Sequence, residues 1–217
     1  MARETKADKL ARAAEILRRL ESAYPGADCA LHWKNPFQLL VATILSAQTS
    51  DEQVNKVTPE LFRRYPTPAA LGAASQEEIE AEIRSIGLFR NKSKSLRLMS
   101  QQLGEACGGE VPQTMEALTS LAGVARKTAN VLLGTAFGIP SGIVVDTHVH
   151  RLAIRLGLCK RTERYPEKVE KELMPLFPQE RWVFLGHALI LHGRQVCTAR
   201  APQCDSCPLG AVCPKRL

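Results

Sequence analysis

Cysteine spacing near the end of the chain indicates an inorganic centre. Four of the seven cysteines fall in the pattern Cys197-x6-Cys204-x2-Cys207-x5-Cys213, with prolines and a glycine between them. Structural zinc usually takes two short chelating pairs, whereas this stretch has a single C-x2-C flanked by two longer loops. Longer loops favour a [4Fe–4S] cluster, whose corners lie further apart than the ligands of one ion. Zinc stays the alternative, and a disulfide is the weakest interpretation for a cytosolic chain.

A glycine turn in the middle of the chain predicts an anion-binding hairpin. The segment Leu121–Ala129 reads LAGVARKTA. A tight turn at Gly123 would point successive backbone N–H groups outward at the start of the next helix, and such groups can bind a phosphate without any side-chain charge. The residues that would form this phosphate seat are Gly123, Val124, Ala125 and Arg126. Any short αα-hairpin can carry a glycine, so the motif needs support from other residues.

A carboxylate and two histidines follow the hairpin in the segment VVDTHVHR, residues 144–151. Asp146 precedes an expected helix, so it can serve as a plain N-cap. The Asp-x-His-x-His pattern also allows a metal site that includes His148 and His150. No third protein ligand is evident nearby in the sequence, which makes the metal interpretation the weaker one.

Taken in order, the hairpin, the Val-Asp-Thr-His segment and the cysteine pattern resemble the endonuclease III family of helix-hairpin-helix glycosylases. The resemblance spans nearly the whole chain. It implies a base-excision repair enzyme that removes oxidised pyrimidines such as thymine glycol from double-stranded DNA and cleaves the strand at abasic sites. It also implies a [4Fe–4S] cluster held by the four tail cysteines. The cluster takes no part in base excision and instead organises a loop that presents Arg200, with the preceding Arg194, to the DNA backbone.

Lys127 resembles the family's nucleophile. The resemblance implies that its amine attacks C1′ of the damaged nucleotide and holds the sugar as a Schiff base, after which β-elimination breaks the strand. A free lysine is almost wholly protonated at neutral pH, so desolvation, the adjacent helix N-terminus and Arg126 would have to favour the neutral amine. Asp146 would stabilise positive charge on the sugar and help to activate Lys127. His148 would line the pocket or orient Asp146. The alternative for Lys127 is a simple phosphate contact.

Two residues of the hairpin depart from the family pattern Leu-Pro-Gly-Val-Gly. Ala122 stands where proline is usual, and Ala125 stands where a second glycine is usual. If position 125 required a positive φ, alanine there would cost on the order of 1 kcal/mol. The hairpin would then adopt a different turn or bind phosphate less tightly.

Two other segments resemble the elements that fill the gap left by an extruded nucleotide. Gln48, in Leu45-Ser-Ala-Gln48, would pair with the orphaned base, and Leu88, in Ile86-Gly-Leu88, would insert between bases of the opposite strand. Each is equally compatible with an ordinary surface residue. A basic series on the following helix offers phosphate contacts or a solvated face: Arg90, Lys92, Lys94 and Arg97.

The elements that must position these residues are predicted to be helices. Leu10, Ala13, Leu17 and Leu20 fall on one helical face. Helix starts are signalled by Asn35-Pro36, by Ser50-Asp51 and by the capping box Ser75-x-x-Glu78, and Gly87 is expected to end the last of these helices. Later helices are expected over 91–106, 148–156, 167–173 and 180–191, with a pair of short helices joined at Gly123. The only β-like run, 143–145, is too short to found a sheet.

The fold class is therefore all-α, with a C-terminal iron–sulfur cluster loop. The resemblance divides the chain into two lobes. Residues 29–139 would form a six-helix lobe that carries the helix-hairpin-helix, and residues 1–28 with 140–217 would form the cluster-containing lobe. DNA would lie across the cleft between the lobes, with Lys127 and Asp146 facing each other.

Composition agrees with a nucleic-acid partner. The 217 residues carry a formal net charge of +7 and a pI of about 9.2, which suits a polyanion. No apolar run approaches the roughly 20 residues of a membrane span, and the charged N-terminus lacks the apolar stretch of a secretory signal. We expect a monomer in the cytoplasm, associated with the nucleoid and with no membrane partner.

Three alternatives compete with this function. A MutY-like adenine glycosylase relies on a pocket glutamate, but residues 35–50 contain no carboxylate and Lys127 is present. A non-enzymatic iron–sulfur DNA-binding protein that senses redox state would fit the cysteines, charge and hairpin, and would need neither Lys127 nor Asp146. A zinc-stabilised structural DNA-binding protein would be colourless rather than brown.

Overall fold

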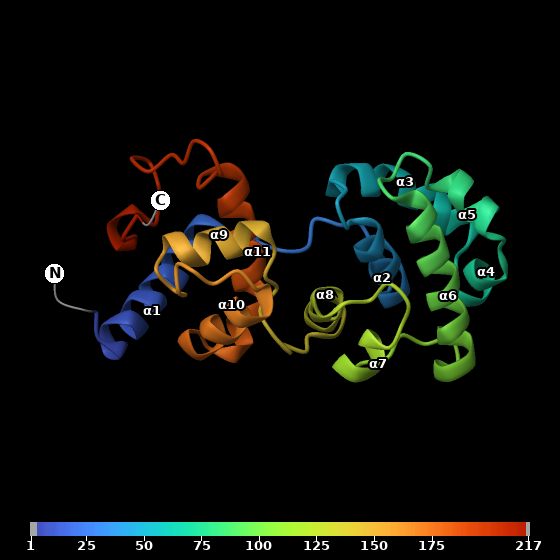
Figure 1. The fold of residues 1–217 in the computed structure, drawn as a ribbon, viewed down its shortest axis with the longest axis horizontal. Coiled ribbons are helices and arrows are strands. Elements are labelled where there is room, and N and C mark those ends of the chain that lie inside the picture. Colours follow the sequence, from blue (N-terminus) through green and yellow to red (C-terminus); the bar gives the residue numbers. More distant parts are fainter. Residues whose placement is uncertain (1–3, 216–217) are drawn as a thin grey trace. The chain divides into compact units, whose positions relative to one another are not determined.

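The protein is all-helical and forms two compact units. The computed structural model describes residues 4–215, and no β-strand occurs among them. One unit is Ala30–Ile139, and the other combines Met1–Cys29 with Pro140–Leu217. Figure 1 shows the helices of each unit. The all-α fold class is therefore confirmed.

Within its described residues, the unit Ala30–Ile139 contains seven α-helices, one more than the expected six. The additional helix is α4, which has six residues and begins at Pro68 behind the N-cap Thr67. It is too short to show an apolar period, so the Pro-Thr-Pro sequence at its start reads as a loop. The helices are α2 (Pro36–Leu45), α3 (Asp51–Arg64), α4 (Pro68–Ala73), α5 (Gln76–Glu82), α6 (Phe89–Cys107), α7 (Met115–Thr119) and α8 (Arg126–Phe137).

Local capping determines where these helices begin. The side chain of Asn35 accepts the N–H of Gln38 before α2, and Ser50 accepts the N–H of Gln53 before α3. Ser75 and Glu78 form the expected capping box. These starts are confirmed, but the expected end of α5 is wrong. That helix ends at Glu82, and Gly87 lies in the turn that leads into α6.

The long helix α6 organises this unit. It packs against α4, α5 and α2, and α2 packs in turn against α8. Figure 1 shows α6 running beside α4 and α5. The interior is aliphatic; its fully buried side chains include Leu39, Leu40, Leu45, Ile79, Leu96 and Met99. This packing places the turn before α6 and the turn before α8 on the same compact unit.

The second unit is built from α1 (Lys6–Ala23), α9 (Thr147–Arg155), α10 (Pro166–Leu173) and α11 (Trp182–Gln195). The apolar face expected on the first helix lies partly in the core: Ala13, Leu17 and Leu20 are buried, but Leu10 is exposed. The β-like run belongs to the same core as an irregular segment, with Ile143 and Val145 buried. A loop that carries the cysteines follows α11.

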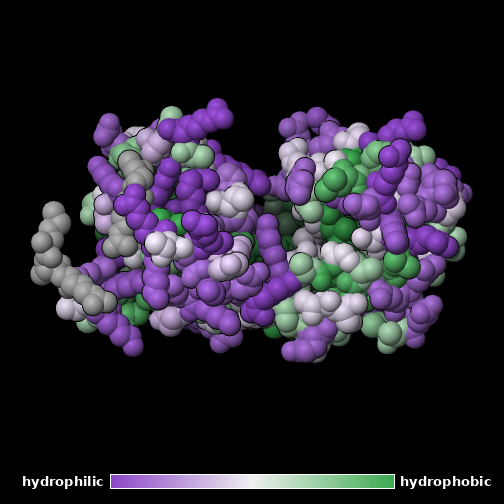
Figure 2. Space-filling view, viewed as in Figure 1, coloured by the Kyte–Doolittle hydropathy of each residue, from purple (hydrophilic) through white to green (hydrophobic). Residues whose placement is uncertain are grey.

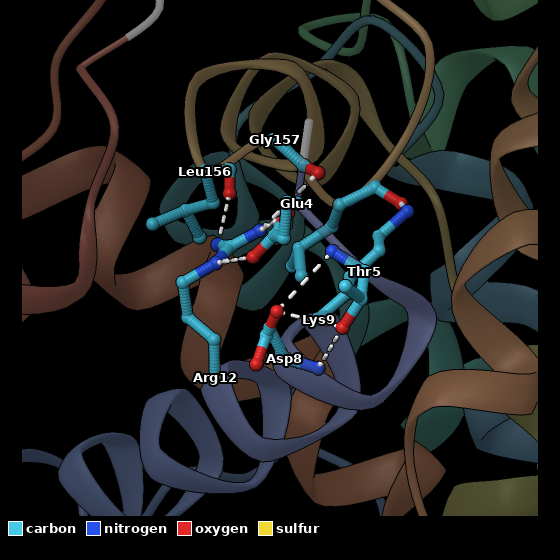
Figure 3. Close-up of polar contacts among 8 residues, drawn as sticks. Glu4, Thr5, Asp8, Lys9, Arg12, Leu156 and Gly157 are labelled. Atoms are coloured by element: carbon cyan, nitrogen blue, oxygen red, sulfur yellow. Dashed lines mark hydrogen bonds and ion pairs between the residues drawn. The ribbon is translucent and has the colours of Figure 1, made fainter. Parts of the chain in front are cut away.

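The N-terminal helix is joined to this unit by polar contacts as well. Thr5 and Asp8 form a capping box at the start of α1. Lys9 Nζ donates to the carbonyl of Leu158 (2.7 Å), and Arg12 donates to the carbonyl of Leu156 (2.5 Å) while pairing with Glu4. Figure 3 shows these side chains converging on the turn after α9. The first helix thereby satisfies carbonyls that the end of α9 leaves without an intrahelical partner.

The face seen in Figure 2 differs in hydropathy between the two units. Figure 2 shows hydrophilic side chains over most of the visible face of the cysteine-containing unit, and more hydrophobic side chains over Ala30–Ile139. No helix in residues 4–215 is both long enough and apolar enough to cross a membrane.

Candidate functional site

The hairpin between α7 and α8 has a turn that only glycine can make comfortably. Gly123 has φ +78°. A Cβ added there would lie 2.8 Å from the Cβ of Ser95 on α6, so the hairpin packs against that helix through bare backbone. The N–H of Val124 donates to the carbonyl of Leu121 (3.1 Å), which closes the turn. Both the conformation and the close approach therefore require glycine at 123.

The two departures in the hairpin carry no strain. Ala125 is the N-cap of α8 with φ −89°, a conformation that any residue adopts, so the expected cost of alanine there is absent. The N–H of Ala122 donates to the side-chain oxygen of Gln102 on α6 (2.8 Å). A proline at 122 would have no N–H to donate. This chain therefore uses Ala122 to attach its hairpin to α6.

The N-terminus of α8 is open to an anion. No side chain caps it, and its first turn contains no acidic residue. Arg126 and Lys127 are the first residues of the helix and are exposed, whereas the preceding Val124 is buried and anchors the turn. Uncapped first-turn N–H groups and the helix dipole together attract negative charge. The structure thus presents a lysine beside a suitable phosphate site.

The two proposed gap-filling residues are exposed and strained in the same way. Gln48 has φ +55° and Leu88 has φ +60°, the left-handed conformation that non-glycine residues seldom adopt. The side chain of Leu88 is 53% exposed although it is a large apolar group. A Cβ added to Gly87 would lie 3.5 Å from the carbonyl oxygen of Gln48, so the two segments are in contact. The structure therefore brings these residues to one place on their unit.

In the basic series on α6, the interpretation of Lys92 as a phosphate contact is wrong. Lys92 is buried and its ammonium bonds to protein oxygens. Arg97, which the same series contains, donates to the carbonyl of Ala74 at the end of α4. The pattern of positive charge along α6 therefore did not distinguish a side chain that bonds to a neighbouring loop, such as that of Lys92, from one that is exposed to solvent.

Asp146 caps α9, as one of its sequence interpretations predicts. Its Oδ1 accepts the N–H groups of both His148 and Val149, each at 2.8 Å. Because Oδ1 makes both bonds, the second carboxylate oxygen stands outside the cap. The cap fixes the orientation of this carboxylate at the start of α9. Asp146 and Lys127 belong to different units.

Arg151 and Arg155 on α9 hold the backbone of the cysteine loop, and sequence reasoning missed both. Arg151 donates to the carbonyls of Gly193 (2.9 Å) and Cys197 (3.0 Å) and contacts Nδ1 of His148 (3.2 Å). Arg155 donates to the carbonyls of residues 198 and 199. The spacing i, i+4 places both arginines on one helical face, which is the signal that would have found them. Arg194 and Arg200 are exposed at either end of this stretch.

All four tail cysteines line a single hollow together with Arg155 and His192. Arg155 Nη1 lies 3.3 Å from the sulfur of Cys197. His192 lies 3.5 Å from the sulfur of Cys207 through Nε2 and 2.9 Å from the hydroxyl of Tyr24 through Nδ1. Burial lowers the pKa of His192 to about 4. His192 is therefore neutral at physiological pH, so Tyr24 can donate to Nδ1 while Nε2–H donates to the sulfur.

The thiols of this hollow are placed where their ionised forms would repel one another. Burial, and then the neighbouring cysteines, raise the pKa of the Cys207 and Cys213 thiols. Among residues 4–215, no group of three or more His, Cys, Asp or Glu side chains is arranged to hold a metal ion. That absence includes Asp146, His148 and His150.

Comparison with protein families assigns most of this chain. Residues 41–179 match the HhH-GPD superfamily of base-excision DNA repair proteins. The match begins within α2 and ends just before α11, so it includes the hairpin and Asp146.

Individual relatives agree with the family match. The endonuclease III of Synechocystis sp. is 54% identical over 96% of this chain and 94% of its own length. A solved structure described as a non-covalent endonuclease III–DNA complex superposes with a TM-score of 0.90 at 45% identity, covering 95% of each chain. A second structure is described as a trapped endonuclease III–DNA covalent intermediate. It has a TM-score of 0.90 at 44% identity, over 95% of this chain and 96% of that one.

Proposed function

The chain belongs to the HhH-GPD superfamily of base-excision DNA repair proteins, in its endonuclease III family, and on this premise we propose which residues perform the reaction. The protein is a bifunctional DNA glycosylase and AP lyase that acts on oxidised pyrimidines in double-stranded DNA. One observation carries the assignment of residues: an exposed lysine, Lys127, stands in the first turn of a helix whose N-terminus is open to phosphate.

The phosphate seat positions the damaged strand. The backbone N–H groups of Gly123, Ala125 and Arg126, where α8 begins, bind a DNA phosphate at the positive end of the helix dipole, whereas the N–H of Val124 is taken by the carbonyl of Leu121. Val124, buried beneath the turn, holds this backbone in place. Because the seat is made of backbone attached to α6 through Ala122, it keeps its geometry without charged side chains.

Lys127 is the nucleophile. Its neutral amine forms a bond to C1′ of the flipped nucleotide while the bond from C1′ to the base breaks and the base leaves with its electron pair. The nitrogen then gives one proton to Asp146 or water, and as the bond from C1′ to the ring oxygen breaks, that oxygen takes up a proton and the nitrogen forms a protonated imine with C1′. The imine acidifies the proton on C2′; its removal expels the 3′ phosphate by β-elimination and breaks the strand. A lysine carries out both steps, so glycosylase and lyase share one residue.

Asp146 provides the negative charge that this reaction needs. Its carboxylate stabilises positive charge on the sugar as the base leaves and accepts a proton from the attacking amine, directly or through water. The cap at Oδ1 orients the group, and the other oxygen is the one assigned to the reaction. His148, linked to Arg151, contributes to the pocket wall beside Asp146.

Gln48 and Leu88 occupy the space that the extruded nucleotide leaves. The amide of Gln48 can donate and accept, so it can pair with the orphaned base, and the apolar Leu88 separates stacked bases in the opposite strand. Their exposure and contiguous positions support this assignment. A leucine exposed over half its surface is explained when DNA covers it.

The four tail cysteines Cys197, Cys204, Cys207 and Cys213 are assigned as ligands of a [4Fe–4S] cluster. Four cysteine sulfurs that line one hollow, with the longer loops between them, suit a multi-atom centre. The N–H donors at Arg155 and His192 suit the electron-rich sulfurs of such a centre. When bound, the cluster supplies a structural crosslink for the loop that presents Arg200 to the DNA backbone, while Arg194 does the same from the end of α11. The protein acts in the cytoplasm, at the nucleoid where its substrate lies.

Borohydride trapping tests the proposal. The substrate is a duplex that contains thymine glycol or an abasic site, and the proteins are wild type, Lys127→Ala and Lys127→Arg. Borohydride reduces an imine to a stable covalent adduct. Arginine keeps the positive charge for a phosphate contact but cannot form the imine.

We expect an adduct with the wild type alone, together with DNA binding by Lys127→Arg close to that of the wild type. An adduct with either variant would remove Lys127 as the nucleophile. Absence of an adduct from folded, DNA-binding wild-type protein would overturn the lyase activity itself.

A further inference from the structure

Lys92 is a lysine buried to 5% exposure, with every ammonium donor satisfied. Its Nζ donates to the carbonyl oxygens of Leu45 (2.8 Å) and Ala47 (2.6 Å) and to the hydroxyl of Thr49 (3.0 Å). An ammonium group has three donors, so none is left over. Lysine is almost never buried unless it is paired. Here the partners of Lys92 are neutral oxygens of one short segment. They compensate the ammonium group for the water that it loses on burial, and they determine where it lies.

The segment that Lys92 holds carries Gln48. Leu45 is the last residue of α2 and its carbonyl lacks an intrahelical partner; a cation there also complements the helix dipole. Ser46–Thr49 follow, and we name them the Gln48 loop. Because Gln48 has φ +55°, this loop is in a conformation that it would leave if nothing held it. The ammonium binds oxygens on both sides of Gln48 and so keeps that residue presented.

The backbone of Lys92 holds the second segment. Its N–H donates to the carbonyl of Leu88 (3.1 Å), the N-cap residue of α6, which has φ +60°. We name Gly87–Leu88 the Leu88 turn. A Cβ at Gly87 would lie 3.6 Å from the hydroxyl oxygen of Thr49, the same oxygen that accepts from Lys92. A further bond, from Gln53 Nε2 to the hydroxyl of Ser85 (2.8 Å), ties the flanks of the two segments together.

We propose that Lys92 is a positioning residue that holds the Gln48 loop and the Leu88 turn as one preformed wedge, so that both side chains enter opened DNA together. The inference rests on the proposed gap-filling role of Gln48 and Leu88. Ordering two loops during binding would consume part of the binding free energy, and a preformed wedge avoids that cost. Lys92 itself is too buried to touch DNA, and its effect is transmitted through the two segments.

The test compares Lys92→Met with Lys56→Met. Methionine keeps the length and apolar character of the side chain but removes all three donors. Lys56 is the matched control: it is a lysine of the same unit whose Nζ bonds Glu52 (2.7 Å), but it is 64% exposed. Excision of thymine glycol is measured in single turnovers on two duplexes. In one the lesion is fully paired, and in the other it lies in a small bubble of mismatched bases, where opening the stack costs less.

We expect Lys92→Met to reduce the rate on the paired duplex about tenfold or more, which corresponds to about 1.4 kcal/mol. The rate on the bubble should change by less than about twofold, and Lys56→Met should leave both rates and their ratio unchanged. In a Gln48→Ala/Leu88→Ala background, adding Lys92→Met should cause little further loss, because the wedge side chains are already gone.

Equal losses on the paired and the bubble duplex would overturn the proposal, as would a full additional loss in the doubly substituted background. If Lys92→Met unfolds at the assay temperature, the variant Thr49→Val replaces it in the test. This variant removes one of the three acceptors of Lys92 and should lower the excision rate on the paired duplex but not on the bubble. An unchanged ratio of the two rates would refute the proposed role of Lys92. A wild-type protein that excises nothing from either duplex would instead refute the proposed function, so the two failures are distinguishable.

Discussion

Gly123 and Gly138 stand before and after α8, both with positive φ, and they differ in what a methyl group would meet. At Gly138 the φ is +66° and nothing lies within 4 Å of an added Cβ. At Gly123 the φ is +78° and the Cβ would lie 2.8 Å from the Cβ of Ser95 and 3.1 Å from its Oγ. Substitution by alanine therefore measures backbone strain at one site, and strain plus steric overlap at the other.

The magnitudes follow from these contacts. Alanine in the left-handed region costs about 1 kcal/mol, so Gly138→Ala should destabilise the protein by that amount and little more. Gly123→Ala should lose the same amount plus about 1–3 kcal/mol from overpacking against α6. The turn at residue 123 must also move in this variant, so that one of its N–H groups no longer reaches the phosphate. Loss of one charge-assisted hydrogen bond weakens DNA binding about tenfold or more.

Urea unfolding measures the loss of stability, and the affinity for a duplex that contains a reduced abasic analogue measures the loss of DNA binding. The double variant Gly123→Ala/Ser95→Gly should recover the steric part when compared with Ser95→Gly alone, but it should keep the cost of the positive φ. Equal destabilisation at Gly123 and Gly138 would show that the contact with Ser95 relaxes freely. Unchanged affinity in a destabilised Gly123→Ala protein would show that this turn does not bind phosphate.

Three other predictions follow from the second unit. Asp146→Asn keeps a capping oxygen, so it should preserve the stability of the protein within about 0.5 kcal/mol while the rate of single-turnover cleavage falls on the order of a hundredfold. Asp146→Ala should lose the same activity and also about 1 kcal/mol of stability. Normal cleavage by Asp146→Asn would assign Asp146 to capping alone. Arg18 and then Arg19 lower the pKa of Glu15 from 4.5 to about 2, so the stability that this pair of contacts provides is present above pH 4.5 and is lost as the pH falls towards 2. Urea midpoints of wild type and Glu15→Gln should therefore differ above pH 4.5 and converge near pH 2, and a difference that persists at pH 2 would contradict this origin. Removal of the proposed cluster, monitored by the loss of visible absorbance, should speed tryptic cleavage at the exposed Arg200. Equal cleavage rates before and after removal would show that the conformation of the cysteine loop does not depend on the cluster.

Much of the local structure could be predicted from the sequence, because it depends on neighbours in the chain. The caps at Asn35, Ser50 and Ser75 act within one helical turn, and all three are present. The turn at Gly123 was predicted on similar grounds. The short α4 was missed because six residues are too few to show a period.

The candidate site was predicted in outline, but not the contacts that position it. The family motifs indicated Lys127, Asp146, Gln48, Leu88 and the cysteines, because chemistry requires particular residue types in a particular order. The positive φ that would have made alanine costly at position 125 is absent, because the residue adopts a φ of −89°, which the motif by itself does not reveal.

Sequence by itself therefore determined most of the helices and their caps and indicated the candidate reactive groups, because these signals are local or carried by residue type. Tertiary structure alone decided that Lys92 holds the Gln48 loop instead of a phosphate, that the N–H of Ala122 bonds Gln102, and that Arg155 binds the cysteine loop. The partners in these contacts lie 20 to 47 residues apart. A lysine or arginine side chain can donate hydrogen bonds to water, to DNA or to a buried carbonyl. Which of these it bonds depends on the oxygens that folding brings within about 3 Å of it, and packing between distant segments determines that distance.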